Sequence, residues 1–342
     1  MISLPSSDHN AEHWLKSLPN LKHIMVVITG ATDGIGKAAA LAMARKQASL
    51  IIIARSCVKA QALIECCLQA NPGGNFRYVH CDLADFSSCE DAIARIMRMH
   101  VPLDVIVANA GGAFDYSTTN SQNLNKTFFV NHTGHFALVT ALLPLLKKTR
   151  DSRIIMQSSV AHYAASGNFD LYFNPQTRAL KSAYADSKLA NLLFARSLRR
   201  HAKLTGAVYR AIASHPGYLV TNINKHTVLS GFAQSAKALV KGNYNPLLLN
   251  IGYHFGLMQP SSLSAALPLL YAAFTEHSYD YIGPQSLFGL RGTPGYSRMS
   301  EMACSDALSH ALWNRSLSWC RANAKSPDLW RQLSRHFAHC ET

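Results

Sequence analysis

The chain has 342 residues, of which 48% are hydrophobic and 15% are charged. This composition is typical of a folded globular protein and excludes a largely disordered one. No stretch reaches the roughly 18 consecutive apolar residues of a membrane span, and residues 1–23 lack the apolar core of a secretory signal. We therefore expect a soluble protein of the cytoplasm.

The chain has eight cysteines and a formal net charge of +14. No two cysteines form a CxxC pair or a cluster with histidine at zinc spacing, so we expect free thiols and no metal site. The lysines and arginines are scattered, and no helix-turn-helix, zinc-finger or RNA-binding signature accompanies them. We expect the charge to serve solubility, with peripheral membrane contact as the alternative, and no nucleic-acid binding.

Apolar runs alternate with segments of helical period along most of the chain. Runs that are apolar throughout indicate strands covered on both faces, hence a parallel sheet joined by helical crossovers. The sequence thus predicts an α/β fold of the Rossmann type, a single domain with helices on both faces of a doubly wound parallel sheet. The predicted strands are residues 24–29, 49–54, 76–81, 103–108, 153–158 and 207–213, and the predicted helices include 36–46, 91–99, 134–148 and 187–200.

We place the domain at residues 22–322, between an N-terminal extension (1–21) and a C-terminal tail (323–342). Residues 223–262 mix proline, glycine and aromatic residues with leucine. Because they follow the sixth predicted strand, we expect them to cover a substrate pocket, with an ordinary surface excursion as the alternative.

Three glycines, Gly30, Gly34 and Gly36, lie between the first predicted strand and the helix after it. Backbone amides at such a turn, together with the helix N-terminus, stabilise an anion such as a phosphate. The alternative is an ordinary tight strand-to-helix turn. The order Thr29-Gly30-Ala31-Thr32-Asp33-Gly34-Ile35-Gly36 differs from G-x-G-x-x-G and is similar to the form found in short-chain dehydrogenases/reductases.

The second predicted strand ends at Ala54 and is followed by Arg55. In dinucleotide-binding folds this place holds an acid that binds the ribose 2′-hydroxyl, or an arginine that accommodates a 2′-phosphate. Arg55 therefore predicts NADP(H) in preference to NAD(H). The alternative is a solvent-facing arginine at a strand end.

Tyr184 and Lys188 lie four residues apart in a segment of helical period, so both side chains project from one face. A tyrosine with a pKa of about 10 is a poor acid or base near neutrality, but an adjacent ammonium favours the phenolate. The pair is a candidate acid/base couple. Considered alone, the two residues could equally be surface residues without a catalytic role.

These motifs, in this order, resemble the short-chain dehydrogenase/reductase family over residues 22–222. Further matches are CDLAD, VANAGG, FFVNHTGHF, RIIMQSS and SHPGYLVT. VNHTGHF, SSVAH and DSKLAN are most similar to the retinol-dehydrogenase-like branch, as is the spacing of 25 positions between Ser159 and Tyr184. Asp186 and Ser187 differ from the residue pairs that are common at these positions in that branch, and we expect this difference to be tolerated. We also expect no N-terminal membrane anchor.

The resemblance implies a catalytic set of Asn131, Ser159, Tyr184 and Lys188. Tyr184 would donate the proton, Lys188 would lower its pKa and bind the nicotinamide ribose, Ser159 would hold the substrate oxygen, and Asn131 would order a water in the proton relay. The resemblance also implies a set of cofactor-binding residues: Gly30, Thr32, Asp33, Gly34, Ile35, Gly36, Arg55, Asp82, Leu83, Asn109, Ala110, Gly111, Tyr184, Lys188, Pro216, Gly217 and Thr221.

The predicted function is the NADP(H)-dependent interconversion of a lipophilic aldehyde or ketone and its alcohol. The alternatives are reduction of an unsaturated ring bond on the same scaffold and a non-catalytic dinucleotide-binding interaction protein. His162, Tyr163 and Tyr218 either line the substrate pocket or pack in the core. The apolar residues 189–195 suit either the core or a homodimer interface.

Overall fold

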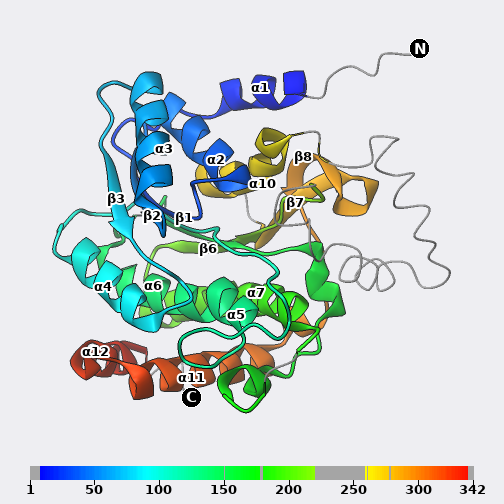
Figure 1. Cartoon of the computed structure of the whole chain (residues 1–342). Helices are drawn as coiled ribbons and strands as arrows, with labels where there is room; N and C mark the ends of the chain where they lie inside the picture. Colours follow the sequence, from blue (N-terminus) through cyan, green and yellow to red (C-terminus); the bar gives the residue numbers. More distant parts are fainter. Residues whose placement is uncertain are drawn as a thin grey trace.

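The computed structural model describes residues 8–149, 151–177, 180–219, 259, 261–276 and 279–337. In this part of the chain an eight-stranded sheet has the order β3-β2-β1-β4-β5-β6-β7-β8 (Figure 1). Strands β1 to β7 are parallel, and β8 pairs antiparallel with β7. The strands are β1 Met25–Thr29, β2 Ser49–Ala54, β3 Phe76–His80, β4 Val105–Ala108, β5 Arg153–Gln157, β6 Arg210–Ser214, β7 Tyr281–Ser286 and β8 Arg291–Tyr296.

The predicted doubly wound parallel sheet is confirmed. Each predicted strand is present, and the largest difference is in β6, which begins at Arg210 instead of residue 207. Strands β7 and β8 were not predicted because prolines interrupt their apolar pattern. Pro284 and Pro294 face each other across this antiparallel pair at the edge of the sheet, where proline is tolerated.

Helices cover both faces of the sheet, as predicted (Figure 1). One face carries α1 Asp8–Ser17, α2 Gly34–Arg45, α3 Cys57–Ala70 and α10 Ser262–Phe274. The other carries α4 Phe86–Met97, α5 Lys126–Phe128, α6 Gly134–Leu142 and α7 Ala183–Thr205. Outside this second layer lie α11 Asp306–Asn323 and α12 Pro327–Phe337. Short 3₁₀ segments are Leu143–Leu145, Val160–Ala164, Phe169–Phe173, Leu287–Gly289 and Met302–Cys304.

The helix predicted at residues 134–148 is shorter than expected. It ends at Leu142 and passes into a 3₁₀ turn, because Pro144 lacks the amide that would continue the α-helical hydrogen bonds. Lys126–Leu145 is the one helical stretch in the described residues that could cross a membrane by length and composition, and 83% of it is buried inside the protein. This stretch is therefore a core element of the fold.

The segments outside the family resemblance also pack on the sheet layers. Ala11 and Leu15 of α1 are buried beside α10, and Trp330 of α12 is fully buried in the opposite layer. The apolar run of residues 189–195 in α7 is buried within the chain, where Trp313 of α11 packs against Phe194. This supports the core interpretation of that run over the interface interpretation.

Candidate active site

The predicted site residues follow the carboxyl ends of neighbouring strands. Because β1 to β6 are parallel, these ends lie along one edge of the sheet, where ligands bind in open α/β folds. Each strand contributes at least one predicted residue there: Gly30 after β1, Arg55 after β2, Asp82 after β3, Asn109 after β4, Ser159 after β5 and Pro216 after β6. Thr221 and residues 223–258 of the predicted cover segment lie outside the described residues.

The glycine turn is compact on its inner side and open on its outer side. Gly30 has a φ of +66°, and a Cβ there would lie 2.6 Å from the Cα of Ala110. A Cβ on Gly36 would overlap the carbonyl oxygen of Gly30, whereas a Cβ on Gly34 would meet no atom within 4 Å. The first amides of α2 have no intrahelical partners and adjoin this open space. The turn therefore fits a phosphate group of a dinucleotide.

Asp33 caps α2, because its carboxylate accepts a 2.7 Å hydrogen bond from the amide of Gly34. The loop after β4 is fixed to the same turn. The hydroxyl oxygen of Thr29 accepts hydrogen bonds from the amides of Asn109 (3.0 Å) and Ala110 (2.9 Å). The Asn109 side chain in turn donates to the carbonyl of Thr29 at 3.0 Å. The two loops thus form one rigid unit.

Asn131 lies in a π-helical segment, Phe129–Thr133, between α5 and α6. Such segments are frequent at functional sites because they displace the local backbone. The buried Asn131 side chain accepts a hydrogen bond from the amide of Gly112 (2.9 Å) and donates to its carbonyl (3.0 Å). A Cβ on Gly111 would lie 2.7 Å from Asn131 Oδ1 and 3.4 Å from Lys188 Nζ. The structure therefore brings Gly111, Asn131 and Lys188 together.

Tyr184 and Lys188 lie near the start of α7, and Ser159 is hydrogen-bonded to Tyr184. The Nζ atom of Lys188 lies 5.5 Å from the centroid of the Tyr184 ring and donates to the carbonyl of Gln157 at 3.2 Å. Burial raises the pKa of Tyr184, while a hydrogen bond with Ser159 lowers it. Burial also lowers the pKa of Lys188, to about 8. A raised tyrosine pKa keeps the phenol protonated near neutral pH, the form that can donate a proton.

The influence of Lys188 on the pKa of Tyr184 stays a prediction. So does the water expected at Asn131, whose side-chain amide already donates to Gly112 and to Ser187.

Two neighbours of Tyr184 have roles that sequence reasoning missed. Ser187 donates to the carbonyl of Tyr184 (2.7 Å) and accepts from Asn131 (2.9 Å). The buried carboxylate of Asp186 accepts four hydrogen bonds, from the amides of Ser166 (2.6 Å) and Gly167 (3.0 Å) and from the hydroxyls of Ser166 (2.9 Å) and Tyr172 (2.6 Å). Asp186 thus fixes the long connection after Ser159 to α7.

Further predicted residues lie along the same edge of the sheet. Arg55 is exposed beyond β2 and Ser56 caps α3, while Leu83 is buried against Gly134. Asp82 closes its own loop by accepting from the amide of Ala84 at 3.0 Å. Gly217 has a φ of +76°, and a Cβ there would overlap the carbonyl oxygen of Leu290, so only glycine brings this loop so close to β8.

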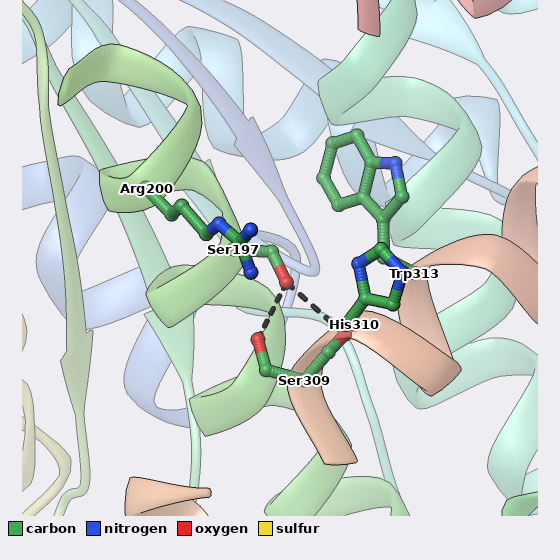
Figure 2. A pocket seen from close by; sticks show the side chains of 5 residues that line it. All are labelled: Ser197, Arg200, Ser309, His310 and Trp313. Carbon is green, nitrogen blue, oxygen red and sulfur yellow. Dashed lines mark hydrogen bonds between the residues drawn. The ribbon is translucent and has the colours of Figure 1, made fainter. Parts of the chain in front are cut away.

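A small indentation between α7 and α11 is a packing contact and no ligand pocket. Figure 2 shows the Ser197 and Ser309 hydroxyls pointing toward each other beside Arg200, His310 and Trp313. The two hydroxyl oxygens lie 2.7 Å apart. The space of about 10 Å³ is at the lower limit of what one water needs. No group of three potential metal ligands occurs among the residues that the structure describes.

This edge of a doubly wound sheet, with its glycine turn and its Ser-Tyr-Lys cluster, defines a dinucleotide-binding oxidoreductase. Residues 24–229 match the family model of the short chain dehydrogenases. Retinol dehydrogenase 13 of Homo sapiens is 34% identical over 260 residues, which are 75% of this chain and 74% of that protein. The chain therefore belongs to the short-chain dehydrogenase/reductase family, in its retinol-dehydrogenase-like branch, and uses a nicotinamide dinucleotide.

The chain is also similar to two further proteins. The chloroplastic short-chain dehydrogenase TIC 32 B of Brassica napus is 33% identical over 216 residues, which are 61% of this chain and 68% of that protein. A crystal structure of an uncharacterised Mycobacterium paratuberculosis protein has a TM-score of 0.68 and 29% identity, covering 90% of this chain and 97% of that one.

Proposed function

We propose that the protein is an NADP(H)-dependent oxidoreductase that interconverts a lipophilic aldehyde or ketone and the corresponding alcohol. One observation carries this proposal: Ser159, Tyr184 and Lys188 lie together on the sheet edge that also holds the glycine turn. A phenol that is hydrogen-bonded to a hydroxyl and adjoins an ammonium is suited to proton transfer. A protein that only binds a dinucleotide does not need such a cluster.

Each residue of the cluster has a separate task. When bound, the nicotinamide supplies the hydride equivalent for reduction or accepts it for oxidation. In reduction, the Ser159 hydroxyl holds the substrate oxygen and the Tyr184 phenol gives it a proton as negative charge develops. The ammonium of Lys188 stabilises the phenolate that remains on Tyr184. Asn131 keeps the loop after β4 in place against α7 through Gly112 and Ser187.

The preference for NADP(H) rests on the end of β2. Arg55 is exposed there, and the residues that follow it, Ser56 and Cys57, carry no carboxylate that would repel a 2′-phosphate. A guanidinium pairs with phosphate in a bidentate manner, so this position favours the phosphorylated cofactor. The lipophilic substrate is supported by the similarity to retinol dehydrogenase 13. A cytoplasmic location also stays a prediction.

Consumption of NADPH and of NADH by the purified protein tests the proposal. The substrates are a series of aldehydes of increasing chain length, a matched ketone and a compound with an unsaturated ring bond, and Tyr184→Phe is the control. We expect NADPH consumption with the longer aldehydes, and consumption by the variant that is at least about 100-fold slower. Turnover of the ring compound alone would favour the alternative enzyme, and NADPH binding without turnover of any substrate would favour a binding protein.

A further inference from the structure

His162 is a fully buried histidine directly beside Ser159. Its Nδ1 atom lies 2.7 Å from the carbonyl oxygen of Ser159, and its backbone amide also donates to that oxygen, at 3.1 Å. The histidine thus closes the short 3₁₀ turn, Val160–Ala164, that begins at Ser159. It is packed beneath this turn, as the core interpretation of this residue expects.

The second ring nitrogen of His162 binds a distant part of the chain. The amide of Ser300, in the segment after β8, lies 3.2 Å from Nε2. A backbone amide can only donate, so Nε2 must be the unprotonated nitrogen and Nδ1 must carry the proton that is donated to Ser159. Neighbouring rings hold the imidazole in this orientation, with Tyr163 at 4.1 Å and Tyr281 at 5.6 Å between centroids.

The orientation of the Ser159 hydroxyl depends on this turn. Ser159 has an extended backbone, and its hydroxyl oxygen accepts a hydrogen bond from the amide of Ala161 at 3.2 Å. The turn is tied to the segment after β8 a second time, because the Tyr163 hydroxyl donates to the carbonyl of Arg298 at 2.9 Å. A shift of the turn would therefore move the hydroxyl of Ser159 relative to Tyr184.

We propose that His162 is the positioning residue of Ser159: its imidazole bridges the Ser159 carbonyl and the Ser300 amide and thereby fixes the hydroxyl that holds the substrate oxygen. This inference rests on the proposed function, since it gives Ser159 its role in the reaction. The donor at Nδ1 is the essential half of the bridge, because it acts on Ser159 itself. The acceptor at Nε2 anchors the ring.

Two substitutions separate the two halves of the bridge. In His162→Asn the side-chain amide nitrogen replaces Nδ1 and keeps the donor to Ser159, whereas in His162→Gln the amide oxygen reaches the Nε2 position and keeps the acceptor for Ser300. Each variant loses one of two buried hydrogen bonds, so we expect similar losses of thermal stability. His201→Asn is the control, because this buried histidine of α7 binds Tyr209 at 2.7 Å, outside the catalytic cluster.

We expect His162→Gln to lower kcat for aldehyde reduction by about 10-fold to 100-fold, as small misplacements of reacting groups do. His162→Asn should keep kcat within about threefold of the unmodified enzyme, since a retained hydrogen bond preserves the geometry. Both variants and His201→Asn should bind NADPH with unchanged Kd. Equal losses of kcat in the Asn and Gln variants, or no loss in either, would overturn the proposal.

A measurement on the unmodified protein covers the case in which a variant does not fold. The ¹⁵N chemical shifts of the assigned His162 ring should show the neutral tautomer with the proton on Nδ1 at neutral pH. A proton on Nε2 would contradict the bridge. This result does not depend on turnover, so it distinguishes a failure of the inference from a failure of the proposed function.

Discussion

The side-chain amide of Asn131 donates a 2.9 Å hydrogen bond to the hydroxyl of Ser187. Ser187 in turn donates to the carbonyl of Tyr184 at 2.7 Å, and Asn131 binds both backbone groups of Gly112. A continuous chain of hydrogen bonds therefore connects the loop after β4 with the helix that carries Tyr184 and Lys188. Displacement of one end would be transmitted to the other, because buried polar groups are costly to leave unpaired.

Ser187→Ala should lower kcat by about 10-fold and destabilise the protein by about 1–2 kcal/mol, since it leaves Asn131 without one partner. The matched control is Ser197→Ala on the same helix. Ser197 is also buried, and its hydroxyl pairs with that of Ser309 at 2.7 Å (Figure 2). It lies more than three helical turns along α7 from Tyr184. Kinetics and thermal unfolding of both variants are the measurements. Equal effects of the two substitutions on kcat would show that Ser187 acts through general stability alone.

Arg55→Ala should weaken NADPH binding by about 1.5–3 kcal/mol, the contribution of a charged hydrogen-bonded pair, and leave NADH binding nearly unchanged. The comparison is Arg331→Ala, which removes the same charge from an exposed position on α12. Fluorescence titration of the unmodified protein and of both variants with each cofactor gives six dissociation constants. Parallel losses for NADPH and NADH, or tighter binding of NADH by the unmodified protein, would contradict the role of Arg55.

The sequence was sufficient for those parts of the site that depend on local pattern. The apolar runs ending at Thr29 and Ala54 predicted buried parallel strands, and the residues just after them had to share an edge of the sheet. Asp186 shows why the rest was missed. Its four donors come from residues 166–172, in a connection without periodicity, so no spacing in the sequence indicates that they converge on one carboxylate. The pairing of His162 with Ser300 spans 138 positions and is equally invisible.

Tyr184→Phe should leave NADPH affinity nearly unchanged and lower kcat by about 100-fold to 10,000-fold, the usual cost of losing a general acid. The loss should appear in kcat more than in KM, because the proton moves only in the transition state. Steady-state kinetics with any aldehyde that the unmodified enzyme reduces provides the test. Retention of more than about a tenth of the activity would mean that the proton comes from another group.

The rate of reduction should fall as the pH rises through about 8, the value to which burial lowers the pKa of Lys188. Above that pH Lys188 loses the charge that stabilises the phenolate formed on Tyr184. Lys188→Arg should move this decline to higher pH, since a guanidinium stays charged throughout the accessible range. The pH dependence of kcat for both proteins is the measurement. A decline at the same pH in both would assign the titration to a different group.

Folding stability should fall steeply below pH 6.5, because four buried histidines are neutral in the folded protein. Burial lowers the pKa of His132 and His215 to about 3 and that of His135 and His162 to about 4. The unfolded chain, with histidine pKa values near 6.5, binds protons first, so the stability present above pH 6.5 is lost as the pH falls toward 4. Each histidine costs about 1.4 kcal/mol per pH unit in this range, or roughly 8 kcal/mol for the four at pH 5.

That cost is comparable with the total stability of about 5–15 kcal/mol of a typical domain. We therefore expect urea midpoints that are steady between pH 7 and 8 and collapse near pH 5.

His132→Phe is the sharpest control, because His132 already lies against the rings of Phe128, Phe136 and Phe194 and another apolar ring can replace it. The variant gives up the contact with Ser316 at 3.1 Å, at a cost of about 1 kcal/mol at neutral pH. Unfolding of this variant should take up one proton fewer between pH 6.5 and 5, so its free energy of unfolding should depend less steeply on pH. An unchanged slope would mean that His132 takes up no proton when the protein unfolds. A stability that is constant down to pH 5 would mean that none of the four histidines does.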